Sequence, residues 1–171
     1  DFSAEMERTL QVLDYAILVI SGTDGVQAHT ETLWQLLERY HIPTFLFINK
    51  IDLAGADRQR ICGELKARLS DSCLPFGDWT DETREGIALC SEALMDELLE
   101  NGDFSQTTLA QAIAQRRLFP CFFGSALKLE GVDEFLTALD TYTLLPHYPE
   151  QFAAKVFKIS RDSQGNRLSW L

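Results

Sequence analysis

Uninterrupted apolar runs alternate along this chain with segments of helical periodicity, and this alternation limits its fold more than any other feature. The runs lie at residues 15–21, 44–49 and 118–123. Strands that are apolar throughout are typical of parallel sheets, because helices cover both faces of such sheets. The sequence therefore predicts an α/β fold in which a mostly parallel sheet lies between two helical layers, with the strand at 15–21 fully buried.

Helices are predicted where apolar residues recur three or four positions apart. Thr80 and Ser105 are suited to begin two of them, because a hydroxyl there accepts a hydrogen bond from an unpaired backbone amide. Residues 71–78 are predicted to form a loop. Pro120 lacks the N–H of a sheet residue, so its strand is expected at an edge. The predicted helices span residues 3–13, 28–40, 57–69, 81–100, 105–117 and 131–143.

The run at 44–49 leads into the polar sequence Asn49-Lys50-Ile51-Asp52. Open α/β sheets bind ligands at the carboxyl ends of their strands. The carboxylate of Asp52 only accepts hydrogen bonds, and guanine offers it two N–H groups, on N1 and on the exocyclic N2. Adenine offers neither, and sites built around such bonds discriminate on the order of 10⁴-fold. Lys50 can lay its stem along a base or ribose, and Asn49 can brace the neighbouring loop.

A second polar loop, Gly124-Ser125-Ala126-Leu127, follows the run at 118–123. Small residues let the backbone approach a ligand closely, so the amide of Ala126 could reach a carbonyl such as guanine O6. Alone, a Gly-Ser-Ala sequence is typical of ordinary turns. Two such loops in this order, each between a strand and a helical segment, indicate a guanine-binding site. Its candidate residues are Asn49, Lys50, Asp52, Ser125, Ala126 and Leu127.

The two loops resemble the guanine-reading loops of GTPases, and their surroundings resemble the translational GTPases in particular. Residues 1–8 are similar to the segment that follows Asp-x-Pro-Gly-His in elongation factor G, and residues 13–31 continue the match. Residues 42–52 and the tail at 156–171 are closer still to the tetracycline ribosomal-protection proteins. The resemblance is weakest across residues 70–117.

This resemblance implies a partial P-loop GTPase-type fold in three layers, without the phosphate-loop strand and followed by a short β-hairpin. Residues 1–145 would be the C-terminal part of the GTP-binding domain, with a helical insertion at 70–117. Residues 146–152 would be a linker. Residues 153–171 would be the first hairpin of a truncated β-barrel domain.

Other parts of a GTPase site are missing from the 171 residues. They contain no Gly-x-x-x-x-Gly-Lys-Ser/Thr sequence and hence no phosphate-binding loop, and they lack the Mg²⁺-binding hydroxyl and the switch threonine. The chain is therefore expected to be a fragment without catalytic or metal-binding residues, which binds GTP or GDP weakly and does not hydrolyse GTP.

The resemblance further implies a parent GTPase that uses Mg²⁺, works on the ribosome and is of the tetracycline-resistance (ribosomal protection) type. Two alternatives remain open at this point. The parent could be an elongation factor G-type translocation factor. The chain could instead be a nucleotide-independent protein-interaction module with a vestigial GTPase site.

Composition adds constraints on partners and location. The chain has 26 Asp and Glu against 15 Lys and Arg, a net charge of −11. Direct nucleic-acid binding is not expected, because it needs a basic surface. The four cysteines and three histidines show no metal-binding spacing. No apolar stretch is long enough to span a membrane, and no signal sequence is present, so no membrane association and a cytoplasmic location are expected.

One expectation concerns self-association. In GTPases, the strand that this fold would lack lies beside the strand at 15–21. Its absence would expose a long apolar edge, of the kind that pairs with other chains. We therefore expect the chain to self-associate through that edge.

Overall fold

The computed structural model describes residues 3–146 and 150–171, and for residues 3–6 the backbone alone. Internal contacts divide the chain into two compact units. The larger consists of residues 15–144, and the smaller of the described residues on either side of that range. The larger unit contains the main sheet and both candidate loops.

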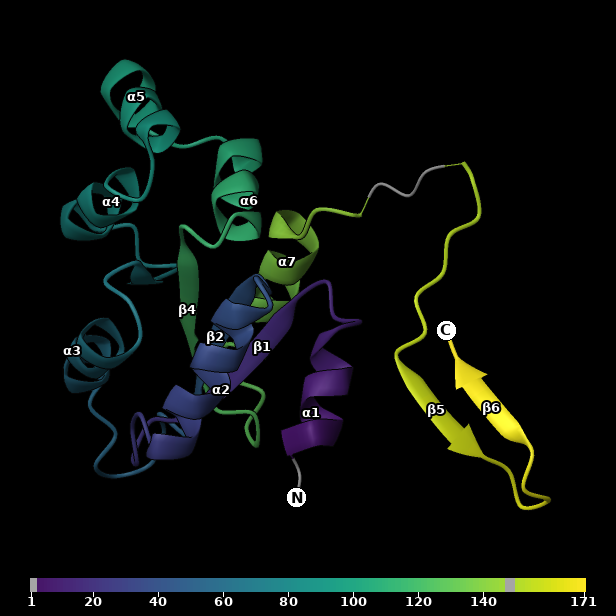
Figure 1. Ribbon diagram of the computed structural model, residues 1–171. Helices are drawn as coiled ribbons and strands as arrows, with labels where there is room; N and C mark the ends of the chain where they lie inside the picture. The colour runs from purple at the N-terminus through teal and green to yellow at the C-terminus, as the bar shows by residue number, and fades with distance from the viewer. Residues whose placement is uncertain (1–2, 147–149) are drawn as a thin grey trace. The chain divides into compact units, whose positions relative to one another are not determined.

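Four strands of the larger unit form one sheet in which all neighbouring strands run parallel (Figure 1). Their order across the sheet is β1-β2-β4-β3. The strands are β1 (Ala16–Ser21), β2 (Thr44–Asn49), β3 (Cys73–Pro75) and β4 (Phe119–Phe123). This arrangement confirms the predicted α/β fold with a mostly parallel sheet.

Helices cover both faces of the sheet, and the side chains of β2 supply both cores. Phe45 and Phe47 belong to one buried cluster, whereas Leu46 and Ile48 belong to the other. Successive side chains of a strand point to opposite faces, so one uninterrupted apolar run serves two helical layers. The first cluster involves α4 (Asp81–Ala88), α5 (Glu92–Asn101), α6 (Gln106–Ala114) and α7 (Val132–Tyr142). The second involves α2 (Ala28–Arg39) and α3 (Arg58–Arg68).

The strand β1 is less buried than its apolar sequence predicts. Leu18 and Ile20 pack in the cluster with α2 and α3. Ile17 and Val19, which alternate with them, are 48% and 59% exposed. Among the described residues, no side chain of β1 belongs to the cluster with α4 to α7. The prediction of a fully buried strand is therefore wrong for one face of β1, because that face lies beyond the helical layer.

The strand that contains Pro120 is not at an edge, contrary to the prediction. β4 lies between β2 and β3. Phe119 donates its N–H to Ser72 O at 3.0 Å, and Phe76 donates to Cys121 O at 2.9 Å, so the neighbours of Pro120 direct their polar groups to the β3 side. Pairing with β2 begins only at Cys121. Pro120 is tolerated because it precedes the first paired residue on the side where its N–H would be needed.

Residues 70–117 differ from prediction in two further ways. The predicted loop at 71–78 contains β3, whose three residues are too few to show strand periodicity. The predicted helix at 81–100 is two helices, because the hydroxyl of Ser91 accepts a hydrogen bond from Leu94 N–H and starts α5 anew. Thr80 and Ser105 cap α4 and α6 as predicted.

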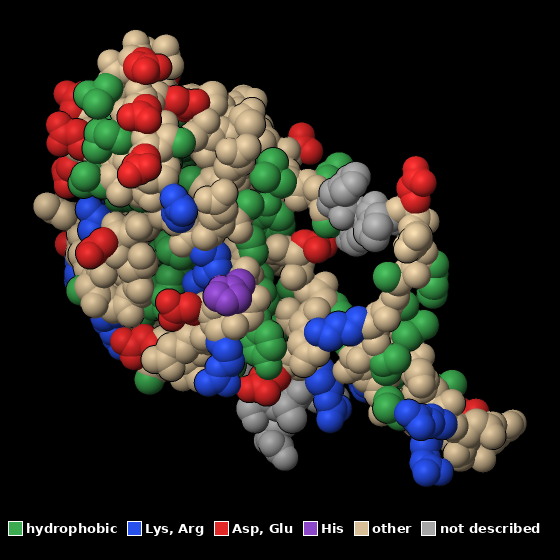
Figure 2. Space-filling view, turned by 45° about the horizontal axis from the view of Figure 1, so that its top comes forward, with side chains coloured by type: hydrophobic (Ala, Val, Ile, Leu, Met, Phe, Trp, Pro, Cys, Tyr) green, Lys and Arg blue, Asp and Glu red, His purple; other side chains and the backbone are tan. Residues whose placement is uncertain are grey.

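The insertion helices also carry much of the negative charge of the larger unit. Acidic side chains gather over this part of the surface at the upper left of Figure 2. Those of α4 and α5 are Asp81, Glu82, Glu85, Glu92, Asp96, Glu97 and Glu100. Among the described residues, no helix has both the length and the apolar character needed to cross a bilayer.

The smaller unit contains one helix and the predicted hairpin. The Asp162 carboxylate fixes the hairpin turn by accepting hydrogen bonds from Gln164 N and Asn166 N at 2.9 and 2.8 Å. Residues 1–2, and residues 147–149 of the predicted linker, lie outside the described part of the chain. The elements are α1 (Ser3–Leu10) and the antiparallel strands β5 (Lys158–Arg161) and β6 (Arg167–Trp170).

Candidate functional site

The two polar loops singled out from the sequence lie side by side at the carboxyl end of the sheet. They follow β2 and β4, which pair up to Ile48 and Phe123. Two backbone hydrogen bonds tie the loops together, one from Gly124 N to Ile48 O at 2.9 Å and one from Ile51 N to Gly124 O at 3.2 Å. Parallel strands that pair directly therefore bring the two sequence motifs into one site.

Asn49 joins the loops through its side chain. Its Oδ1 accepts hydrogen bonds from Lys50 N at 2.8 Å and from Ala126 N at 2.9 Å. The amide of Ala126, which the sequence suggested as a donor to guanine O6, is thus bonded to Asn49 in this structure. Through this hydrogen bond, the Asn49 side chain connects its own loop to the neighbouring one.

Gly124 allows the close approach of the two loops. A Cβ at this position would lie 2.3 Å from Glu130 O and 2.8 Å from a ring carbon of Phe47. Glu130 also closes the second loop, since Ser125 N donates to Glu130 O at 3.0 Å and Glu130 N donates to Ser125 O at 3.1 Å. The loop of residues 124–130 is therefore a compact turn whose position depends on the glycine.

Asp52 is the charged centre of the site. Only 12% of its side chain is exposed, and its Oδ2 lies 3.0 Å from Nζ of Lys128. Hydrogen bonding to Lys128, and secondly to the hydroxyl of Ser125, lowers the pKa of Asp52. The same contact with Asp52 raises the pKa of Lys128. The carboxylate is thus held in its ionised form, which is the form that accepts hydrogen bonds from N–H donors.

Lys128 is the residue that the sequence prediction missed. It directly follows the predicted loop, and the position of a cation next to that loop is the signal that could have drawn attention to it. Its ion pair with Asp52 depends on the turn of residues 124–130, which residue spacing alone does not show.

Lys50 and Leu127 are exposed at the rim of the site. Lys50 has a φ of 65°, in the left-handed region that residues other than glycine rarely adopt. Leu127 is 94% exposed although its side chain is apolar. An exposed apolar group and the stem of a lysine can both contact the face of a base.

A third loop supports the site from the side of β1. Gly22 N donates to Asn49 O at 2.7 Å. Arg60 of α3 donates in turn to the carbonyls of Gly22 and Thr23 at 3.2 and 3.1 Å. The carboxyl ends of β1 and β2 are therefore fixed to each other and to α3.

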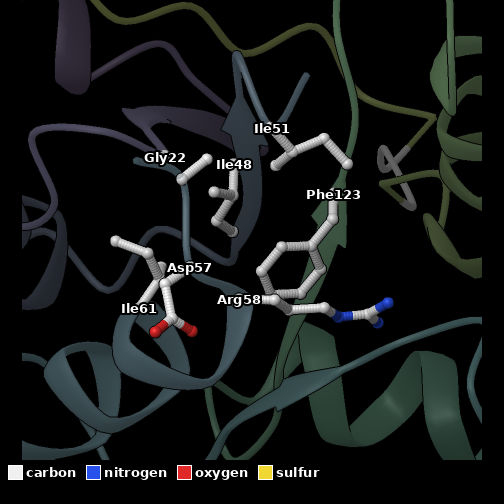
Figure 3. Close-up of a pocket in the computed structure, with 8 residues that line it drawn as sticks. Gly22, Ile48, Ile51, Asp57, Arg58, Ile61 and Phe123 are labelled. Carbon is white, nitrogen blue, oxygen red and sulfur yellow. The ribbon is translucent and has the colours of Figure 1, made fainter. Parts of the chain in front are cut away.

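A small cavity of about 140 Å³ lies beneath these loops (Figure 3). Ile48, Ile51, Ile61 and Phe123 give it an apolar lining. Arg58 also lines the cavity, and its Cζ lies 4.3 Å from the centre of the Phe123 ring. None of the six predicted site residues lines the cavity, so it is distinct from the surface that those residues form.

The described residues do not fit a metal site. They contain no group of three or more His, Cys, Asp or Glu side chains arranged to hold an ion. The thiols of Cys62, Cys73, Cys90 and Cys121 are not paired in disulfides. Burial raises the pKa of Cys62, Cys90 and Cys121, which makes these thiols poor ligands and nucleophiles.

Comparison with known families agrees with the geometry of the loops. The sequence model of the elongation factor Tu GTP binding domain matches residues 1–144. The chain belongs to this family. The family is one of translational GTPases, and guanine-nucleotide binding is a property of the family.

The fold of this GTP-binding domain recurs in solved structures. One of them, a crystal structure of a protein from Thermus thermophilus, aligns with a TM-score of 0.72 and 21% sequence identity. The alignment covers 98% of this chain and 33% of the other. The chain thus spans about a third of the length of that protein.

Proposed function

We propose that this domain selects guanine nucleotides through the loops 49–52 and 124–127. The observation that carries the proposal is the hydrogen bond from Ala126 N to Asn49 Oδ1, which joins the two loops into one surface beside a largely buried, ionised Asp52. Asp52 would accept hydrogen bonds from guanine N1–H and N2–H, and Ser125 would hold the carboxylate in place. Lys50 and Leu127 would contact the two faces of the base.

Within the longer protein of which this chain would be a part, the domain would be the base-reading half of a GTPase acting on cytoplasmic ribosomes. Residues outside this chain would bind the phosphates and Mg²⁺, because the 171 residues contain no phosphate loop. GTP hydrolysis would therefore not occur on this chain alone. The resemblance of residues 42–52 and 156–171 supports the tetracycline ribosomal-protection type over an elongation factor G-type translocation factor.

The proposal predicts weak but selective binding of GDP. Contacts with the base alone correspond to a dissociation constant on the order of millimolar, about 4 kcal/mol. Ligand-observed NMR should therefore detect GDP and not ADP. The Asp52→Ala variant should lose the GDP signal, because the acceptor for N1–H and N2–H is gone. The control Asp140→Ala removes the same charge from the exposed surface of α7 and should leave binding unchanged.

Two outcomes would contradict this function. Equal binding of GDP and ADP would show that the site does not read the base. An absence of binding to both nucleotides, in a chain whose circular dichroism is that of a folded α/β domain, would favour a protein-interaction module with a vestigial nucleotide site.

A further inference from the structure

The Asp52 carboxylate, which would read the base, already has a partner in this chain. Lys128 Nζ lies 3.0 Å from Asp52 Oδ2, and the Lys128 side chain is 51% exposed while that of Asp52 is 12% exposed. The ammonium therefore occupies one oxygen of a carboxylate of which little is exposed. We propose that Lys128 competes with the guanine base for the Asp52 carboxylate. The Lys128 ammonium must leave Asp52 before the base can bind. This inference rests on the guanine-binding function proposed above.

Hydrogen-bond chemistry makes the two partners rivals. Guanine presents N1–H and N2–H side by side, so it engages both carboxylate oxygens together. The ammonium of Lys128 is a donor of the same kind and is bound to one of those oxygens. A base that binds both carboxylate oxygens therefore needs the oxygen that the Lys128 ammonium holds. The empty site is thus satisfied by a residue of the chain, and a bare buried charge is avoided.

The backbone around Lys128 allows the side chain to leave without unfolding of the loop. Lys128 N donates to Ser125 O at 3.2 Å and Leu129 N to Ala126 O at 3.4 Å, within the turn that Ser125 and Glu130 close. Leu129 holds the left-handed conformation of that turn, with a φ of 60°. The main chain is therefore fixed, whereas the lysine stem is half exposed and its ammonium can move into water at little cost.

The competition should respond to salt in a way that simple base binding does not. Salt screens the attraction between Lys128 and Asp52, because the Lys128 side chain is half exposed to solvent. Guanosine carries no charge, so salt acts on its binding only through the protein. Raising the salt concentration should therefore strengthen guanosine binding to the wild-type chain severalfold.

The test measures guanosine binding by ligand-observed NMR for the whole 171-residue chain and three variants. Measurements at about 20 mM and about 500 mM NaCl compare weak with strong screening. Lys128→Met should bind guanosine severalfold more tightly than wild type at low salt and should lose the salt dependence. Lys128→Ala should behave in the same way, which excludes a gain from apolar contact of methionine with the base. Lys66→Met removes an equal charge from α3 and should behave as wild type.

The outcomes separate this inference from the proposed function. If all variants bind guanosine in preference to adenosine, but with equal affinity and equal salt dependence, Lys128 is not a competitor and the guanine site stands. If Lys128→Met binds more weakly than wild type, Lys128 assists the base, and the inference is overturned. If no variant binds guanosine at either salt concentration, the proposed function fails, and the inference fails with it.

Discussion

At the scale of single residues, the site depends on groups that do little chemistry themselves. Asn49 accepts hydrogen bonds from backbone N–H groups of two different loops. Gly124 lets those loops approach each other, because it has no Cβ. Asp52 and Lys128 carry the charge, but their positions follow from these two neighbours. A substitution that leaves every charged residue intact can therefore still disrupt the site.

Gly124→Ala tests this dependence. The added methyl would overlap Glu130 O and Phe47, so we expect a loss of about 1–3 kcal/mol of the free energy of unfolding together with loss of GDP binding. Urea unfolding and ligand-observed NMR measure the two effects. In Gly63→Ala, the Cβ meets no atom within 4 Å, and α3 should gain about 0.5–1 kcal/mol. An unfolding midpoint of Gly124→Ala equal to that of wild type would contradict the packing argument.

At the scale of elements, the junction of α5 and α6 shows how one carboxylate can connect two helices. Glu97 accepts hydrogen bonds from Ser105 N at 2.8 Å, Ser105 Oγ at 2.9 Å and Thr108 Oγ1 at 2.6 Å. The hydrogen bond from Thr108, followed by that from the Ser105 backbone, lowers the pKa of Glu97 from its ordinary 4.5. The N-terminus of α6 is thus held by the side chain of the preceding helix.

Glu97→Gln should destabilise the chain by roughly 1 kcal/mol at pH 7, because hydrogen bonds to a carboxylate are replaced by weaker ones. The folded-state pKa of Glu97 is lower than that of the unfolded chain, so this stabilisation is complete above pH 4.5 and is lost as the pH falls through the lowered value. Urea midpoints of wild type and Glu97→Gln should differ more at pH 7 than at pH 3. Glu100→Gln, on the same helix, serves as the control, and an equal difference at both pH values would contradict the assignment.

The elements also show what the sequence could and could not predict. Long apolar runs located β1, β2 and β4, because uninterrupted strands need covered faces. β3 was missed because three residues have no readable period. Pro120 was expected at an edge because it lacks an N–H, but β3 occupies that edge. The two candidate loops adjoin strands and were found from local sequence. The contact of Lys128 with Asp52 joins residues 76 positions apart and needs the folded turn, so no local pattern reports it.

At the scale of the whole molecule, the open side of β1 is the feature with the widest consequence. Among the described strands, β1 pairs only with β2, and Ile17 and Val19 are about half exposed. Sheet edges with exposed apolar side chains readily pair with other chains. The net charge of −11 opposes such association at low salt.

We therefore expect the wild-type chain to self-associate at high micromolar concentration, and more so in salt. Val19→Lys should keep it monomeric, because a charged side chain on an edge strand blocks pairing. Leu99→Lys, which changes an exposed apolar residue on α5, should leave association unchanged. Static light scattering measures the molar mass, and a wild-type monomer at every salt concentration would refute the role of this edge.

The hydrogen bond between Asn49 and Ala126 also has a consequence for synthesis on the ribosome. Its two residues are 77 positions apart, so the second reaches the tunnel well after the first. At about 5–20 residues per second, this delay lasts roughly 4–15 s. During that interval the nascent chain contains Asp52 but not yet the loop of residues 124–130, which contacts it. Under the proposed function, a newly made copy would therefore recognise a nucleotide only when β4 has emerged and docked beside β2.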